Sequence, residues 1–455
     1  MKLNKYKLGE LVEVTRGASL SGQFYAEEGE LIRLTLGNFN MNGGGFKENT
    51  SKTDLYYTGT VKDEFILNKG DIITPLTEQS LGLLGTTARI PESGKYIQSQ
   101  DVALVKCKEG LLDPNFCYYL ISSSVVRQQL SAGAQQTKIR HTSPDKIKDC
   151  TVWMPDLEEQ KRIGRILIDI DEKITLNRQI NDNLEAMAKQ LYDYWFVQFD
   201  FPNEEGKPYK SSGGTMVWNE KLKRKIPQGW SNGILSDVAN ITMGQSPDGS
   251  SYNEDGEGII FYQGSTDFGL RFPDIRQYTT SPSRYANKGD ILMSVRAPVG
   301  ALNIANNDCC IGRGLSALSS KIGSMTHLYY LMNDFRLKFE GMNSAGTTFG
   351  SITKNELFSL PVIIPTKSVF SEFEQVCEPI FYKQMIIGEE INALTKQRDE
   401  LLPLLMNGQA SVNYHLSVLF ITKIMLYYKE TNINFRYERN NNTKRFRWNE
   451  SGSVC

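Results

Sequence analysis

The feature that most constrains this chain is an internal repeat. Four short segments of the first half return in the same order in the second half, between 210 and 219 positions later. They are residues 68–73 with 287–292 (NKGDII and NKGDIL), 118–120 with 329–331 (YYL), 131–133 with 344–346 (SAG), and Pro155 with Pro365. A constant order with a drifting offset indicates one scaffold encoded twice, with loops of different length. The 455 residues are therefore expected to form two domains of one design.

Each copy has two parts of different composition. The first parts, residues 1–155 and 230–366, are rich in Gly, Ser, Thr and Asn and contain short β-type runs such as Val102–Lys106. This texture predicts a sheet-containing α+β domain. The second parts, residues 156–198 and 367–410, lack glycine clusters, and each is predicted to form one long helix.

Two segments lie outside the repeat. Residues 199–229 carry the turn chemistry of a linker between the copies. Residues 411–455 run from an apolar stretch into a basic, asparagine-rich end. We expect this tail to be disordered. The alternative is an added basic arm that contacts DNA or a partner.

The two long helices carry apolar residues at coiled-coil spacing and are predicted to pack against each other in antiparallel orientation. In the second helix the steps alternate between four and three, with polar interruptions at Gln384 and Arg398. Pro379 is expected to kink this helix or break its first turns. The predicted seam residues, which are also the candidates for docking partner subunits, are Ile163, Ile166, Ile170, Ile174, Leu184, Met187, Leu191 and Tyr194 in the first helix and Phe373, Cys377, Ile380, Ile387, Ile391, Leu394, Leu401 and Leu405 in the second.

Two asparagines interrupt the seam of the first helix. Asn177 and Asn181 match Ile387 and Ile391 of the second helix. One interpretation places both asparagines near solvent, where a coiled coil tolerates them. The other buries them, so that they fix the register of the pair, as a single polar seam residue can.

The sequence carries no convincing motif of methyl transfer, DNA cleavage or ATP hydrolysis. Asp113–Phe116 superficially resembles the Asp-Pro-Pro-Phe loop of adenine methyltransferases, but the second proline is missing, and Asp as N-cap with Pro at the first helical position explains it more simply. Asp156 and Glu159 contain letters of a PD…ExK nuclease at too short a spacing and fit a capping box instead. No phosphate-binding P-loop occurs. The chain is therefore interpreted as non-catalytic.

Composition excludes several other classes of protein. The seven cysteines include no C-x-x-C pair and only three histidines are present, so neither a metal site nor a disulfide framework is predicted. The net charge of −1 argues against a uniformly basic surface. We find no signal peptide and no apolar run suited to crossing a membrane, so a cytoplasmic protein is expected.

Several segments, together with the repeat, resemble the DNA-specificity subunits of type I restriction–modification systems over residues 1–410. The resemblance rests on residues 77–82 (TEQSLG), 155–160 (PDLEEQ), 192–200 (YDYWFVQFD), 295–300 (VRAPVG), 312–315 (GRGL) and 401–408 (LLPLLMNG). It implies two target recognition domains, each reading one half of a split, asymmetric site in double-stranded DNA, held apart by the antiparallel helices.

The resemblance also implies partners. Two adenine-methyltransferase subunits would dock on the helices, and restriction (translocase) subunits would join through them. S-adenosylmethionine, ATP and Mg²⁺ would then belong to those partners, and no cofactor or metal to this chain. The alternatives are a stand-alone sequence-specific DNA-binding regulator and a coiled-coil protein-interaction scaffold.

Candidate DNA contacts lie in three loops of each copy. Base edges are read by Arg, Lys, Asn, Gln and small hydroxyl side chains. The alternative for each residue is that it only solvates a turn. The predicted contacts are Arg16, Ser19, Thr77, Gln79, Ser80, Gln136, Lys138 and Arg140 in the first copy, and Gln245, Ser246, Ser294, Arg296, Thr347, Thr348 and Lys354 in the second.

Overall fold

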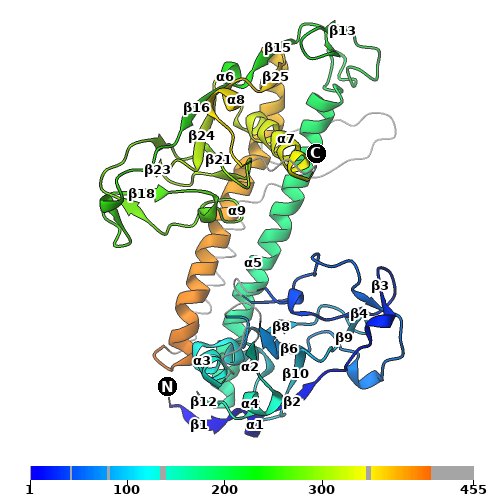
Figure 1. The fold of residues 1–455 in the computed structure, drawn as a ribbon, viewed down its shortest axis with the longest axis vertical. Coiled ribbons are helices and arrows are strands. Elements are labelled where there is room, and N and C mark those ends of the chain that lie inside the picture. Colours follow the sequence, from blue (N-terminus) through cyan, green and yellow to red (C-terminus); the bar gives the residue numbers. More distant parts are fainter. Residues whose placement is uncertain (1, 41–43, 79–81, 134–139, 345–349, 411–455) are drawn as a thin grey trace. The chain divides into compact units, whose positions relative to one another are not determined.

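The computed structural model describes residues 2–40, 44–78, 82–133, 140–344 and 350–410. The chain divides into two compact units. Unit 1 contains residues up to Glu172 together with those from Thr395 onward, and unit 2 contains Lys173–Leu394. Each unit holds one α+β domain and one portion of each of the two long helices (Figure 1).

The domain of unit 1 is built on a four-stranded antiparallel sheet. Its strand order is β2 (Val12–Arg16), β10 (Val102–Cys107), β6 (Ile72–Pro75), β8 (Ala88–Arg89). An outer sheet has the order β3 (Tyr25–Ala26), β5 (Tyr56–Tyr57), β4 (Ile32–Arg33), β9 (Tyr96–Ile97). The remaining elements are the pairs β1 (Asn4–Lys7) with β12 (Thr151–Met154) and β7 (Thr77–Glu78) with β11 (Arg140–His141), and the helices α1 (Leu8–Leu11), α2 (Pro114–Ser122), α3 (Ser124–Gly133) and α4 (Pro144–Lys148).

The domain of unit 2 repeats this plan, with a main sheet of four strands in the matching order and an outer sheet of five strands instead of four. Its main sheet has the order β16 (Ala239–Met243), β24 (Leu315–Ser320), β21 (Ile291–Ser294), β22 (Leu302–Ile304). Its outer sheet has the order β17 (Tyr252–Asn253), β19 (Tyr278–Thr279), β18 (Ile259–Tyr262), β23 (Cys309–Ile311), β20 (Tyr285–Ala286). The pair β15 (Ser231–Ile234) with β25 (Pro361–Ile364) matches β1 with β12, and the helices are α6 (Leu235–Val238), α7 (Met325–Ser344) and α8 (Lys354–Phe358). The predicted duplication of an α+β domain is confirmed.

The start of the first long helix joins the core of unit 1. Helix α2 begins after Asp113, whose carboxylate accepts hydrogen bonds from the amides of Asn115 and Phe116. This confirms the capping role predicted for Asp113. The buried face of α2 packs into one hydrophobic cluster with Ile163 and Leu167 of the first long helix. Burial of this apolar surface stabilises the domain on its helix.

The long helices are α5 (Leu157–Tyr192) and α9 (Lys367–Met406). A π-helical turn, Asp193–Val197, follows α5. Helix α9 runs without interruption through Pro379, so the predicted break is wrong. In unit 2, Asn177 of α5 contacts Glu390 of α9, and Glu185, further along α5, contacts Gln384, which comes earlier in α9. The two helices therefore run in opposite directions. The antiparallel pair is therefore confirmed.

The seam of α9 was predicted closely, whereas that of α5 was predicted only in part. All predicted α9 positions are buried except the half-buried Leu401. In α5, Met187 is 42% exposed, and Ile166 and Leu191 are half-buried; Tyr194, in the π-helical turn that follows, is 37% exposed. The buried α5 positions instead follow steps of four and three through Ile163, Leu167, Ile170, Ile174, Asn177, Asn181, Leu184, Ala188 and Tyr192.

The asparagines of the α5 seam are buried. Asn177 is 1% exposed and Asn181 is 7% exposed. The interpretation that places them near solvent is therefore wrong. The Nδ2 atom of Asn177 donates to Oε2 of Glu390 over 2.9 Å, which satisfies one of its polar groups inside the pair.

The segment between the copies is ordered. Residues 199–229 contain the hairpin β13 (Met216–Asn219) with β14 (Arg224–Pro227). The ring of Phe201, which precedes this hairpin, stacks on the ring of Tyr209 with a centroid distance of 4.6 Å and on the ring of Trp230 with a centroid distance of 5.0 Å. The linker thus has a small aromatic core of its own.

Within the described ranges, no helix is both long and apolar enough to cross a membrane. The same ranges contain no cluster of three or more His, Cys, Asp or Glu side chains placed to hold a metal ion.

Candidate nucleic-acid interface

In unit 1 the three predicted loops meet at one edge of the main sheet. Strand β2 ends at Arg16 beside Ala103, and β6 ends at Pro75 beside Val102. Strand β11 then pairs with β7, which directly follows β6. The first residues of β10 therefore lie next to all three segments.

A turn that precedes β10 ties these segments together. The amide of Ala18 donates to the carbonyl of Gln98 over 2.9 Å, and the amide of Leu76 donates to that of Asp101 over 2.8 Å. A Cβ atom at Gly17 would lie 2.2 Å from the Gln98 carbonyl oxygen, so only glycine fits this close approach. The exposed tip of the turn is Gln100, which sequence reasoning did not select.

Unit 2 uses the same hydrogen bonds at equivalent positions. The amide of Gln245 donates to the carbonyl of Ile311 over 3.0 Å, and the amide of Val295 donates to the carbonyl of Gly314 over 2.9 Å. The amide of Arg313 donates to Oγ of Ser246 over 3.3 Å. Ile352, just before α8, donates its amide to Val295 over 3.0 Å. Here too, three loops surround one turn.

Arg313 is the exposed tip of this turn in unit 2 and the counterpart of Gln100. Sequence reasoning noted the GRGL segment only as a family-like stretch. Its arginine between two glycines was the available signal, because flanking glycines let a backbone approach closely while one long donor side chain remains outside.

The two units present different side chains on this shared frame. Thr77 and Glu78 of unit 1 correspond to Arg296 and Ala297 of unit 2, because each pair follows the same strand and meets the same returning segment. A common backbone with different side chains can position two readers alike while they select different bases.

The predicted contacts fall into distinct groups. Arg16, Ser19, Gln245, Arg296 and Lys354 are exposed, and Arg140 and Ser246 are half-buried. Six predicted contacts lie outside the described residues, namely Gln79, Ser80, Gln136, Lys138, Thr347 and Thr348.

Thr77 and Ser294 are buried, at 7% and 1% exposure, contrary to the prediction that they contact DNA. The hydroxyl of Thr77 donates to Oδ1 of Asp101 over 3.0 Å, and that of Ser294 donates to the carbonyl of Arg296 over 2.6 Å. Both hydroxyl groups are thus used inside the domain, and neither is presented to a base edge. They shape the ends of β6 and β21 instead.

Arg140 holds the interface of unit 1 together. Its Nη1 atom lies 3.2 Å from Oε1 of the buried Glu78. The other oxygen of Glu78 accepts the amides of Gly82, Leu83 and Leu84 at 3.0 to 3.1 Å. Arg140 also donates to Ser131 of α3. This arrangement compensates the buried charge of Glu78 and fixes β11 against α3.

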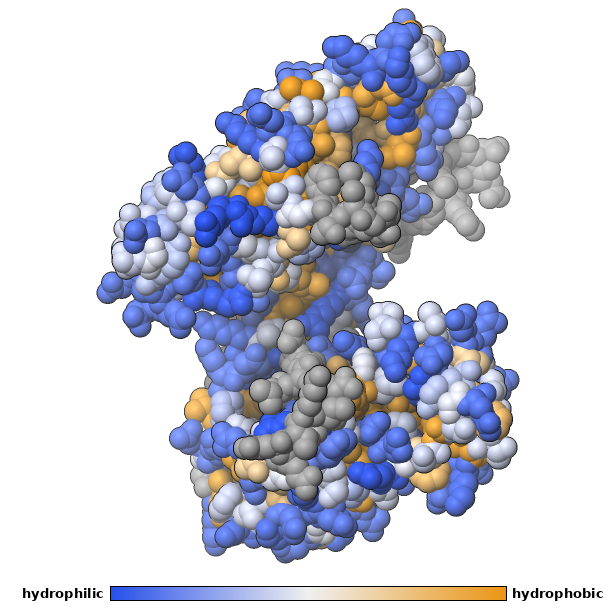
Figure 2. Space-filling model, in the orientation of Figure 1, coloured by the Kyte–Doolittle hydropathy of each residue, from blue (hydrophilic) through white to orange (hydrophobic). Residues whose placement is uncertain are grey.

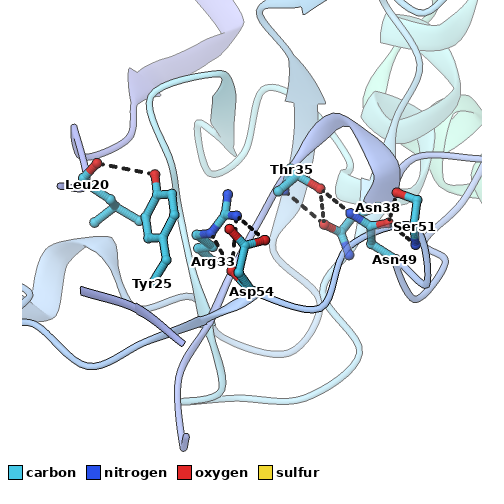
Figure 3. Close-up of polar contacts among 8 residues, drawn as sticks. All are labelled: Leu20, Tyr25, Arg33, Thr35, Asn38, Asn49, Ser51 and Asp54. Carbon is cyan, nitrogen blue, oxygen red and sulfur yellow. Dashed lines mark hydrogen bonds and ion pairs between the residues drawn. The ribbon is translucent and has the colours of Figure 1, made fainter. Parts of the chain in front are cut away.

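The loop that carries Ser19 is anchored at its far end, as Figure 3 shows. The hydroxyl of Tyr25 donates to the carbonyl of Leu20 over 3.3 Å. The guanidinium of Arg33 lies 3.8 Å from the centre of the Tyr25 ring and donates to both the carbonyl and the carboxylate of Asp54. This cation–π contact and ion pair limit the freedom of the loop.

The visible face of the molecule is mainly polar. Figure 2 shows hydrophilic residues over most of the visible face, with hydrophobic residues gathered in smaller patches.

Comparison with known proteins identifies the family. The model of the type I restriction modification DNA specificity domain matches residues 2–186 and 227–397, one stretch in each copy of the repeat. The MjaX type I restriction enzyme specificity subunit of Methanocaldococcus jannaschii is 30% identical over 388 residues, which cover 80% of this chain and 85% of the relative. The MjaIX specificity subunit of the same organism is 25% identical over 322 residues, 67% of this chain and 71% of the relative.

A crystal structure of the S subunit of a type I restriction–modification system from M. genitalium has the same fold. It matches with a TM-score of 0.58 at 17% identity, covering 89% of this chain and 96% of that one. The catalytic activities of such systems lie in partner subunits, so the sequence-based interpretation as a non-catalytic protein is confirmed. This chain belongs to the DNA-specificity subunits of type I restriction–modification systems.

Proposed function

We propose that each unit reads one half of a split, asymmetric site in double-stranded DNA. The observation that carries this proposal is the shared loop frame with different exposed side chains, Gln100 in unit 1 and Arg296 with Arg313 in unit 2. Because one chain carries two different readers, it has no need of a palindromic target, which a symmetric dimer would require.

We further propose that the helix pair sets the spacer between the half-sites. Helix α5 has 36 residues, which corresponds to roughly 54 Å of helix. One turn of duplex DNA is about 34 Å, so a helix of this length can separate two readers by such a turn. Helices α5 and α9 each run without a break, which supports a rigid spacer.

The proposed partners are two adenine-methyltransferase subunits that dock on the helices and restriction (translocase) subunits that join through them. S-adenosylmethionine, ATP and Mg²⁺ would be bound by those partners. The complex would act in the cytoplasm, where the DNA is. Membership of the family displaces the two alternatives, a stand-alone regulator and a coiled-coil scaffold.

We expect the purified chain alone to transfer no methyl group and to cut no DNA. Added methyltransferase subunits should produce methylation at one split sequence. Incorporation of labelled methyl groups from S-adenosylmethionine measures both outcomes, and the methyltransferase without this chain is the control. Methyl transfer or cleavage that co-purifies with the chain itself through several columns would contradict the proposed division of labour.

Arg313 is expected to read a base in the half-site of unit 2. An arginine that makes a bidentate contact with guanine contributes about 1–3 kcal/mol of discrimination, so Arg313→Ala should relax the preference at one base pair. Binding of the complex to targets substituted one position at a time measures this preference. Arg313→Lys is the matched control, since it keeps the charge and loses the fork geometry. Equal weakening on every target, restored by lysine, would instead indicate a phosphate contact.

A further inference from the structure

A partly buried polar junction joins the two long helices to the recognition domain of unit 1. The carboxylate of Asp171 in α5 accepts from Nη1 of Arg398 in α9 over 2.9 Å, and its other oxygen accepts from the hydroxyl of Tyr119 in α2 over 2.5 Å. Tyr119 and Arg398 are both buried. Burial and the adjacent Asp171 raise the pKa of the Tyr119 phenol, which keeps it a donor.

Unit 2 contains a second junction of the same kind. Oε2 of Glu185 in α5 accepts from Nε2 of Gln384 in α9 over 2.8 Å and from the hydroxyl of Tyr330 in α7 over 3.2 Å. Arg271, from the loop between β18 and β19, lies 3.4 Å from the same oxygen and donates to Oε1 of Gln384 over 3.0 Å. Gln384, Tyr330 and Arg271 are all buried.

The two junctions share one plan. In each, a carboxylate of α5 meets a polar seam residue of α9 and a tyrosine from the recognition domain. Tyr119 and Tyr330 are the matching tyrosines of the repeated YYL segments. The two polar interruptions of the α9 seam are therefore the two residues that complete the junctions.

Both junctions belong to a single register of the helix pair. The α5 carboxylates are separated by two heptads, and so are Gln384 and Arg398. A slip of one heptad would place Arg398 opposite Gly164 in one direction and opposite Arg178 in the other. Either slip would remove the ion pair between Arg398 and Asp171 and leave Arg398 with Asp399 of its own helix, whose side chain is 59% exposed, so these alternatives are penalised.

We propose that Asp171 and Glu185 are positioning residues that fix the helix register and hold each recognition domain on the helix pair, so that the subunit accepts one spacer length. This inference rests on the proposed role of the helices as the spacer. Neither carboxylate is expected to touch DNA. Their effect on specificity would act through the tyrosines and through Arg271, Gln384 and Arg398.

The test uses the assembled methyltransferase complex with Asp171→Asn or Glu185→Gln. Each change keeps the shape of the side chain and removes its charge. We expect methylation of sites with a spacer one base pair longer or shorter to rise about tenfold relative to methylation of the normal site. This factor corresponds to the loss of about one charge-assisted hydrogen bond. Methylome sequencing measures this ratio. Matched controls are Glu172→Gln and Asp182→Asn, which alter exposed carboxylates of the same helix.

A second set of variants keeps the test decisive if the first destabilises the protein. Tyr119→Phe and Tyr330→Phe remove one hydrogen bond each and should relax the spacer less. Arg398→Met should relax it, whereas Arg398→Lys should retain most of the wild-type strictness. A purely structural role would lower methylation of all sites equally and leave the spacer ratio unchanged, and this result would overturn the inference.

The outcome is separable from that of the proposed function. If lengthening the helices changes the spacer while Asp171→Asn and Glu185→Gln remain as strict as wild type, only the positioning role is wrong. If lengthening the helices leaves the spacer unchanged, the proposed spacer function itself fails.

Discussion

Replacing residues 1–155 with the matching domain of a relative should exchange one half of the recognised DNA sequence and leave the other half unchanged. The physical reason is that each unit has its own hydrophobic core, its own sheet pair and its own set of converging loops. Methylation of the old sequence should fall at least about a hundredfold, because each mismatched base pair costs about 1–3 kcal/mol and several change together. Methylome sequencing of cells that carry the chimera gives both half-sites directly.

The structure shows which contacts the donor domain must keep. A Cβ atom at Gly164 of α5 would lie 2.7 Å from the amide of Phe116, so the first turn of α2 packs directly on the helix backbone. The side chain of Gln160 accepts from the amide of Asp113 and donates to the carbonyl of Pro155. A replacement domain whose helix equivalent to α2 begins with the same Asp-Pro turn should therefore fit.

The reciprocal chimera, with residues 230–366 exchanged, is the matched control. In unit 2, Glu374 of α9 accepts from the hydroxyls of Ser324 and Thr326 at the start of α7. A replacement domain with hydroxyl residues at the start of its helix equivalent to α7 should preserve this contact. Such a chimera should exchange the other half-site. A chimera of either kind that changes both halves at once would show that the domains do not read independently.

The duplicated fold could be predicted from sequence because its signals are local. The repeated NKGD turn stands just before the central strand of each main sheet, and Gly70 and Gly289 have φ values of 90° and 95° in the two copies. A position with positive φ favours glycine, so the turn leaves the same residue in both copies.

The seam of α5 was predicted poorly because burial there does not follow hydrophobicity. Asn177 and Asn181 occupy consecutive seam positions, so the apolar pattern has a gap between Ile174 and Leu184. After Leu184 it continues through Met187 and Leu191, whereas the buried positions are Ala188 and Tyr192. The chain tolerates buried asparagine because Glu390 of the partner helix accepts a hydrogen bond from Asn177. That partner is more than two hundred residues away in sequence, and no local pattern reveals it.

The three predicted loops of each copy meet in the folded domain, but the exposure of their individual side chains could not be predicted from sequence. Thr77 and Arg296 hold equivalent positions, yet the first is buried and the second is exposed. The difference arises because Asp101 accepts a hydrogen bond from Thr77, whereas the counterpart of Asp101 is Gly314. Whether a polar loop residue faces DNA thus depends on a second segment that reaches the loop only in the folded domain.

Lengthening both helices by four residues should lengthen the spacer of the target by one or two base pairs. The insertions belong after Ile174 in α5 and after Leu394 in α9, close to the points at which the two units divide. An apolar residue at the fourth inserted position keeps the seam. Four residues add about 6 Å of helix and turn it by about 40° beyond a full turn. One base pair adds roughly 3.4 Å and turns the duplex by roughly 34°.

Two controls separate spacing from damage. The same insertion in α5 alone would move Glu185 away from Gln384 while Asp171 remained at Arg398, so the pair could not form both contacts, and assembly should fail. An insertion of two residues in both helices would turn the seam by about 200° and bury polar faces. Methylome sequencing of an active complex with the four-residue insertions decides the matter. Unchanged half-sites with an unchanged spacer would mean that the distance is set by the partner subunits and not by α5 and α9.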